Sequence, residues 1–405
     1  MGRWLALIYV AGVIAACGDD GGTSAADAAS ISDAHISVDA APVCIRPPGA
    51  ADAVRKVVIA HPYDDAGMQY GGYEVYELSG DGQIASTGVT FEMHRAFDGV
   101  IAFTPDGKLG FASQDDGTVG IFRINGDRRV DVLDAAYDGE GDDNFYATSV
   151  VMGAGGSIAY VLNSQWRENG GGIYALRINC DDTITYLGAV AAAKLPYGLH
   201  LLAGDSRAVV IADDVLDSAT GGVHLLSWGD SPGVLATADL FSDDQAIIAG
   251  TAVTADGHYV LAGDNSQFSG VDNRVAVASI AGDTLTAIQV LTPIEDPIAI
   301  VTSPDNDAAL VVSGLGDALF ELDYAPTNTT TPFSMVGELS YSGAGPQLPA
   351  GAVLIDRGGL RGRVVIAENT GIRQVQFESG AITDLGATST GSGLGAIVGA
   401  IGVQP

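Results

Sequence analysis

The sequence predicts an all-β fold, a seven-bladed β-propeller that the C-terminal strand closes by joining the N-terminal blade. A turn-forming segment recurs about every 50 residues, which is the spacing of a four-stranded propeller blade. Each turn separates two runs of alternating apolar residues, the pattern of half-buried strands. No segment beyond the first 17 residues has the length and 3.6-residue periodicity of a helix.

The clearest copy of the repeat is Asp98–Ile124, in which Thr-Pro-Asp-Gly separates two apolar strands. Pro, Asp and Gly favour tight turns, so this segment predicts a hairpin. A second pair of strands follows, at Thr118–Arg123 and Arg129–Leu133. Turns of the same kind are centred on residues 106, 155, 205, 256, 305 and 358. Four antiparallel strands per unit are the module of a propeller.

Six complete units begin near residues 99, 147, 197, 249, 298 and 350. Residues 56–91 supply three further strands that lack a first strand, and residues 393–403 supply one strand that lacks partners. Joining the two pieces makes a seventh blade and removes the open sheet edges that promote aggregation. We therefore predict a propeller over residues 55–405.

The pattern Pro-x-Gly-Val-Ala-Val-Ser/Thr-Pro-Asp-Gly, followed by a second strand and Asp-Asn/Gly-Thr-Val, resembles that of YVTN-type and lactonase-like seven-bladed propellers. It is carried by Asp98–Ile124, Pro196–Ile211, Thr251–Ala262 and Pro297–Leu322. The resemblance implies the fold, whereas activities differ within the group. Some members hydrolyse sugar lactones, and others are binding or surface-layer proteins. No catalytic set of a lactonase maps onto this sequence.

The N-terminal segment predicts a lipoprotein. Residues 1–16 combine Arg3 with an apolar run that is too short to cross a bilayer, as in a bacterial signal peptide. Ile14-Ala-Ala-Cys17 resembles a lipobox, in which the cysteine is acylated and becomes the new N-terminus. Residues 17–54 then form a tether rich in Ala, Gly, Ser and Asp. We expect a protein held on a bacterial membrane through Cys17, either in the periplasm or on the cell surface; an uncleaved signal anchor is the alternative.

The net charge of −32 and the isoelectric point near 4.1 disfavour nucleic acid as a partner, because nucleic acid binding requires clustered Lys and Arg. Two cysteines remain besides Cys17, namely Cys44 and Cys180. Outside the cytoplasm such a pair tends to oxidise. A Cys44–Cys180 disulfide would attach the end of the tether to the propeller, and two free buried thiols are the alternative.

Catalytic signatures are scarce. The sequence has no G-x-x-x-x-G-K, G-x-G-x-x-G or H-E-x-x-H motif. His200 stands out because it lies in a predicted first strand, which lines the central channel. It is a candidate acid, base or ligand group. A histidine that only packs within the strand is the alternative.

Loops between the second and third strands indicate where a ligand would enter. In blades 3 to 5 these loops are long and consecutive, at Asn163–Gly171, Asp213–Gly222 and Asp264–Asn273, and the first blade's loop, His61–Tyr70, is also long. Aromatic, Arg and carboxylate groups there suit sugars, organic cations or calcium. The candidate ligand-binding residues are Trp166, Arg167, Asp214, Asp217, Asp264, Phe268 and Arg274. Polar loops without a function are the alternative.

Asp138, Glu140 and Asp142 have the alternating spacing of oxygen ligands in a calcium-binding loop. The segment lacks the glycine at the sixth position, and Ser149 stands where a bidentate Glu belongs, so a solvated acidic loop is the alternative. Calcium is the only cofactor that the sequence suggests.

Three functions remain open. The sequence favours a membrane-tethered binding or scaffold propeller whose ligand is an envelope protein, a glycan or a small molecule. A lactonase-like hydrolase that uses the channel mouth is the second reading, and a structural envelope lipoprotein is the third. A cluster of His, Arg and carboxylate groups at the channel mouth would favour the enzyme.

Overall fold

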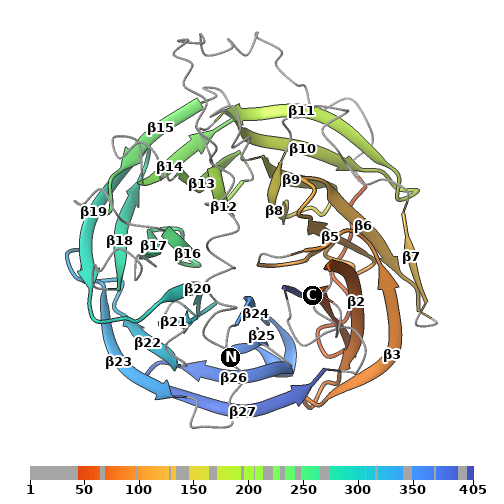
Figure 1. Cartoon of the computed structure of the whole chain (residues 1–405). Helices are drawn as coiled ribbons and strands as arrows, with labels where there is room; N and C mark the ends of the chain where they lie inside the picture. The colour runs from red at the N-terminus through yellow and green to blue at the C-terminus, as the bar shows by residue number, and fades with distance from the viewer. Residues whose placement is uncertain are drawn as a thin grey trace. The chain divides into compact units, whose positions relative to one another are not determined.

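The computed structural model describes residues 44–405 apart from sixteen short gaps: 64–68, 97–98, 127–128, 134–145, 164–170, 193–195, 205, 213–221, 229–232, 242–247, 265–272, 306, 315–317, 341–348, 369–370 and 391–398. The described part is an all-β ring of seven four-stranded antiparallel sheets (Figure 1). Among these residues no helix has the length and apolar character needed to cross a bilayer.

Each blade runs from an innermost strand at the axis to an outermost strand at the circumference (Figure 1). Blade 1 consists of β28 (Ala400–Val403), β1 (Arg55–Tyr63), β2 (Gln69–Leu78) and β3 (Ile84–Glu92). Blade 2 consists of β4 (Ala102–Phe103), β5 (Leu109–Ser113), β6 (Val119–Ile124) and β7 (Val130–Val132). Blade 3 consists of β8 (Ala147–Met152), β9 (Ile158–Asn163), β10 (Gly172–Ile178) and β11 (Ile184–Ala192).

Blade 4 consists of β12 (Pro196–Leu201), β13 (Arg207–Ala212), β14 (Gly222–Ser227) and β15 (Gly233–Ala238). Blade 5 consists of β16 (Ile248–Val253), β17 (Tyr259–Asp264), β18 (Arg274–Ala281) and β19 (Thr284–Leu291). Blade 6 consists of β20 (Pro297–Thr302), β21 (Ala308–Ser313), β22 (Ala318–Tyr324) and β23 (Phe333–Ser340). Blade 7 consists of β24 (Gly351–Leu354), β25 (Arg363–Glu368), β26 (Gly371–Glu378) and β27 (Ala381–Ser389); a short 3₁₀ turn, η2 (Gly358–Leu360), follows β24.

The repeated turn joins the first and second strands, as predicted. In blade 2 the amide of Gly107 donates to the carbonyl of Thr104 at 2.7 Å, and Gly257 and Thr254 repeat this bond in blade 5. Both glycines have φ near +70°, a region that side chains with a Cβ rarely adopt. This conformational demand explains why Gly follows Asp in these copies of the repeat.

The hydrophobic core is divided among the interfaces between blades. Seven clusters of buried apolar side chains each span two neighbouring sheets. The cluster between blades 4 and 5, for example, joins Ile211 and Leu225 to Val260 and Ala276. Because each sheet buries both faces, consecutive apolar residues of its second strand are buried, as in Val209–Ile211 of β13 and Val364–Ala367 of β25.

The ring closes as the sequence predicts. β28 pairs with β1 in antiparallel register, with Val403 opposite Val57 and Ala400 opposite Ala60. Ile401 is fully buried, and its carbonyl accepts a hydrogen bond from the amide of Ile101 in the connection to blade 2. The last strand of the chain therefore supplies the innermost strand of the first blade.

Candidate functional site

The seven innermost strands surround the axis of the ring (Figure 1), and their residues can be aligned by one hydrogen bond. In every blade, the first residue after this strand donates its amide to a carbonyl near the start of the second strand; these donors are Thr104, Gly153, Leu202, Thr254, Ser303, Ile355 and Gln404. Two residues before each donor lie Ala102, Val151, His200, Ala252, Val301, Val353 and Gly402. One blade thus places an imidazole where the other six place a small apolar residue.

His200 contacts a second departure from the repeat. Its Nε2 lies 2.8 Å from Oγ1 of Thr251 in the neighbouring blade. Thr251 lies three residues before the donor of its blade. At the equivalent position the other blades carry Ile101, Val150, Leu199, Ile300, Ala352 and Ile401. Both residues of the pair are partly exposed on strands that face the axis, so solvent reaches them. We take this hydrogen-bonded pair, on two innermost strands near the axis of the ring, as the candidate functional site.

Burial lowers the pKa of His200 to about 4, although a hydrogen bond with the backbone of Thr251 acts in the opposite direction. The residue as a whole keeps some accessible surface, but surrounding protein atoms remove most of the hydration of the imidazole and disfavour its charged form. At neutral pH the ring is therefore uncharged. It can donate one hydrogen bond and accept one.

This pKa predicts a pH dependence of stability. Because the unfolded chain binds the proton with a pKa near 6.5 and the folded chain only near 4, stability falls as the pH drops from 6.5 to 4 and is constant below. The loss is at most about 3 kcal/mol, and residual solvent reduces it. Urea unfolding of the native protein and His200→Gln across this range isolates the effect. We expect the difference between the two proteins to change with pH, and a constant difference would contradict the lowered pKa.

Two of the candidate rim residues contact each other. Asp264 ends β17 and Arg274 begins β18, and the guanidinium Nε lies 2.9 Å from Oδ2 of the carboxylate. Asp264 is fully buried, while the cation of Arg274 stacks 4.6 Å from the ring centre of Phe241. This ion pair fixes the base of the blade-5 loop. Its carboxylate is therefore not a free calcium ligand at the rim.

The other predicted site residues lie outside the described part of the chain. They are the rim residues Trp166, Arg167, Asp214, Asp217 and Phe268, the acidic segment Asp138, Glu140 and Asp142, and the acylation site Cys17. Among the residues that are described, no group of three or more His, Cys, Asp or Glu side chains is arranged to hold a metal ion. The calcium site stays a prediction for a titration followed by thermal melting.

Sequence reasoning missed a cation–aromatic cluster on the other side of the rim. Arg95, in the connection between blades 1 and 2, pairs with the carboxylate of Asp115 and lies over the ring of Tyr63. His94 contacts Asp116 at 3.3 Å beside it. These residues come from three separate segments, so no spacing in the sequence connects them. The structure also corrects the first blade's loop, because His61 is a buried residue of β1 and the strands extend to Tyr63 and from Gln69.

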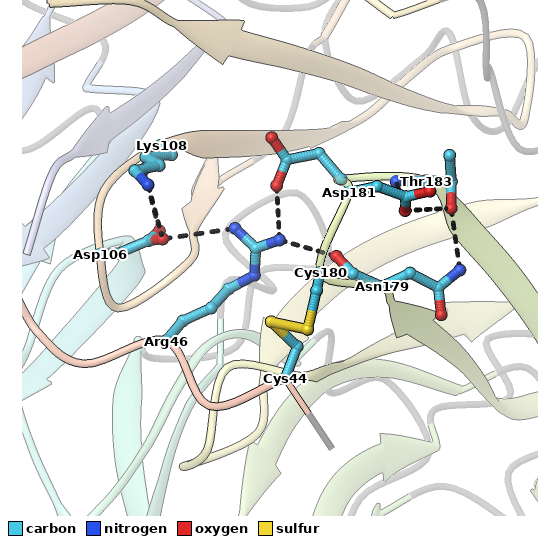
Figure 2. Close-up of a disulfide and its surroundings, with 9 residues drawn as sticks. Cys44, Arg46, Asp106, Lys108, Asn179, Cys180, Asp181 and Thr183 are labelled. Atoms are coloured by element: carbon cyan, nitrogen blue, oxygen red, sulfur yellow. Dashed lines mark hydrogen bonds and ion pairs between the residues drawn. A yellow bond between two sulfur atoms is a disulfide. The ribbon is translucent and has the colours of Figure 1, made fainter. Parts of the chain in front are cut away.

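An N-terminal arm, residues 44–54, packs against the ring before β1. Cys44 forms a disulfide with Cys180 in the turn of blade 3, with their Cα atoms 5.2 Å apart (Figure 2). The buried guanidinium of Arg46 lies between blades 2 and 3, where it contacts Asp106 at 3.3 Å and Asp182 at 2.5 Å. The amide of Gly359 in blade 7 donates to Asp52 at 2.8 Å. The arm therefore links blades on both sides of the closing blade.

Comparisons with solved structures support the fold. A candidate 6-phosphogluconolactonase from Bacteroides fragilis aligns with a TM-score of 0.57 at 12% identity, covering 88% of this chain and 99% of its own. The periplasmic gluconolactonase of Pseudomonas aeruginosa aligns with a TM-score of 0.59 at 15% identity, covering 84% and 98%. Sqt1 of Chaetomium thermophilum, bound to the N-terminus of ribosomal protein L10, aligns with a TM-score of 0.55 at 12% identity, covering 84% and 88%.

These identities are low enough that the similarity concerns the fold alone. The three structures include lactonases and a protein-binding propeller, so the fold is shared by proteins of different activity. No protein-family model and no curated protein sequence matches the chain.

Proposed function

We propose that this protein is a membrane-tethered, extracytoplasmic binding propeller that takes a small molecule into its central channel against His200 and Thr251. The observation that carries the proposal is the departure of these two residues from the apolar residues that the other six blades carry at the same two positions. The other six blades carry Ala, Val or Gly at the position equivalent to His200. An imidazole and a hydroxyl that meet across two blades and remain partly exposed supply the convergent polar groups of a ligand site.

The pKa of His200 favours binding over acid–base catalysis. A general base works best when its pKa lies near the operating pH. With a pKa of about 4, His200 is neutral at pH 7 but has little affinity for a proton. Because Nε2 is hydrogen-bonded to Thr251, Nδ1 of the neutral ring remains to orient a hydroxyl group of a ligand without ionising.

Binding can be tested with a panel of free sugars, sugar lactones, alkyl and aryl glycosides, sugar phosphates and amino sugars, screened by ligand-observed NMR. We expect His200→Ala to lower the affinity for the ligands that bind about tenfold, because it removes one well-placed hydrogen bond. His224→Ala is the matched control, because His224 lies in the same blade and contacts Thr237 at 2.7 Å on the outer strands. Equal affinity of His200→Ala and the native protein for every binder would refute the site.

The membrane tether rests on the sequence and is tested separately. Acylation of Cys17 predicts that the native protein sediments with membranes and partitions into detergent, since two or three acyl chains anchor a protein stably. We expect Cys17→Ser to abolish acylation and retain the signal peptide. The measurement is incorporation of labelled palmitate; equal labelling of native protein and variant would rule out this anchor.

A lactonase-like hydrolase is the second candidate function. It is favoured by the fold shared with the Pseudomonas gluconolactonase and by a neutral imidazole next to a hydroxyl in the channel. Hydrolysis of glucono-1,5-lactone above the spontaneous rate, and its loss in His200→Ala but not in His224→Ala, would favour the enzyme. A structural envelope lipoprotein, the third possibility, predicts no binder and no hydrolysis.

A further inference from the structure

The seven innermost strands form the wall around the axis, as far as the structure describes it. None of the residues in the seven innermost strands, β28, β4, β8, β12, β16, β20 and β24, is Asp, Glu, Lys or Arg. This contrasts with a chain that carries 50 acidic and 18 basic residues. The wall thus differs in composition from the rest of the molecule, and this difference limits which ligands it can accept.

The available polar groups of this wall lie on one side. Ser149, His200 and Thr251 belong to β8, β12 and β16, which are consecutive around the axis (Figure 1). All three are partly exposed. Within the described part of the chain, neither the Ser149 hydroxyl nor Nδ1 of His200 has a hydrogen-bond partner. These atoms are free to bond to a ligand.

Other hydroxyls of the wall are already used by the fold. Oγ1 of Thr302 donates to the carbonyl of Val253 at 2.8 Å, and Oγ1 of Thr148 donates to the carbonyl of Leu162 at 3.3 Å. Ser149 differs from them in having no such internal acceptor among the described residues. It also departs from the repeat, because the same level of the other blades carries Val100, Gly198, Gly250, Ala299, Gly351 and Ala400.

The opposite side of the wall is apolar. β24, β28 and β4 contain only Gly, Ala, Val, Leu, Ile and Phe. Several of their side chains remain accessible, among them Ala102, Val353 and Leu354, and Val100 just before β4 is 46% exposed. Blades 7, 1 and 2 therefore present an apolar surface across the axis from the hydroxyl and imidazole groups of blades 3 to 5.

Resting on the proposed function, we infer that the channel selects an uncharged, amphipathic ligand whose hydroxyl-bearing edge bonds to Ser149, His200 and Thr251 and whose apolar part packs against blades 7, 1 and 2. A charged ligand would lose hydration in this wall without gaining a counter-ion, which costs several kcal/mol. The net charge of −32 adds a further penalty for anions such as sugar phosphates. A purely polar ligand would leave its hydroxyls unpaired against the apolar side.

Four matched probes test the inference: phenyl β-D-glucoside, glucose, glucose 6-phosphate and glucosamine. The first is uncharged and amphipathic. Glucose lacks its apolar group, and the other two differ from glucose by one negative or one positive charge. We expect the glucoside to bind at least tenfold more tightly than each of the others. Ser149→Ala should lower the affinity for the glucoside about three- to tenfold, because it removes one hydrogen bond. Ser334→Ala on the outermost strand of blade 6 is the matched control and should leave binding unchanged.

The outcomes separate the inference from the proposed function. Glucose 6-phosphate or glucosamine could instead bind more tightly than the glucoside and lose affinity in His200→Ala. That result would overturn the inference and leave channel binding intact. Equal affinity of Ser149→Ala and the native protein for the glucoside would overturn the assignment of the polar side. Binding of the glucoside that is unaffected by both His200→Ala and Ser149→Ala, or no binding of any probe, would refute the proposed function together with the inference.

Discussion

A variant that lacks residues 393–405 is expected to unfold or aggregate at temperatures where the native protein is folded. The deletion removes β28, whose residues Ala400, Ile401 and Val403 are buried. It also exposes the edge of β1 along the register from Val57 to Ala60. The lost side-chain burial and strand pairing amount to about 5 kcal/mol or more, comparable with the whole stability of many domains. Circular dichroism melting and light scattering measure the effect.

The matched control for this deletion keeps the strand and changes one methyl group. Ile401→Val should cost about 1 kcal/mol and leave a folded ring, because it removes little volume from the interface. The truncated chain should also regain its native spectrum when residues 393–405 are supplied as a peptide. A truncated protein that melts as the native protein does would contradict closure by the C-terminal strand.

Loss of the Cys44–Cys180 disulfide has the second-largest expected effect. The bond joins residues 136 apart and attaches the arm to the turn of blade 3. Removing such a cross-link typically costs about 2–5 kcal/mol. Cys44→Ser should therefore lower the urea midpoint, and reduction of the native protein should lower it by the same amount. Cys180 is exposed, so reductant reaches the bond without prior unfolding.

Arg46→Ala provides the comparison for this effect. Arg46 belongs to the same arm as Cys44, and its buried guanidinium contacts Asp106 and Asp182 of the ring. Its removal is therefore expected to lower the free energy of unfolding by about 1–3 kcal/mol while the disulfide remains. Electrophoresis with and without reductant and thiol counting report the bond directly. Two free thiols in native protein purified without reductant would contradict it.

The fold was predictable because the same strand and turn pattern recurs several times along the sequence. Turns such as Thr104–Gly107 and Thr254–Gly257 recur with a fixed conformational demand, and the incomplete blade at residues 56–91 needs the strand at the C-terminus. Strand ends were less predictable. The sequence places His61 at the start of a long loop, yet it is buried within β1. Polarity along a sequence does not show how far a hairpin ladder continues.

The site was predictable only in part. The position of His200 in an innermost strand follows from the repeat, but its partner Thr251 lies 51 residues away in the next blade. Contacts between blades depend on how two sheets pack, and one sequence does not reveal that. Asp264 and Arg274 were selected as separate rim groups, whereas the hairpin register places them opposite each other as an ion pair.

The central claim is that a neutral His200 contacts the ligand in the channel. Nitrogen-15 NMR of the histidine side chains, with His200 assigned through His200→Gln, tests it most directly. We predict that the His200 ring remains neutral at pH 6, with a pKa of about 4, and that its shifts change when phenyl β-D-glucoside is added, while those of His224 do not. A His200 ring that titrates near pH 6.5, or that is unaffected by a glucoside bound elsewhere, would contradict the claim.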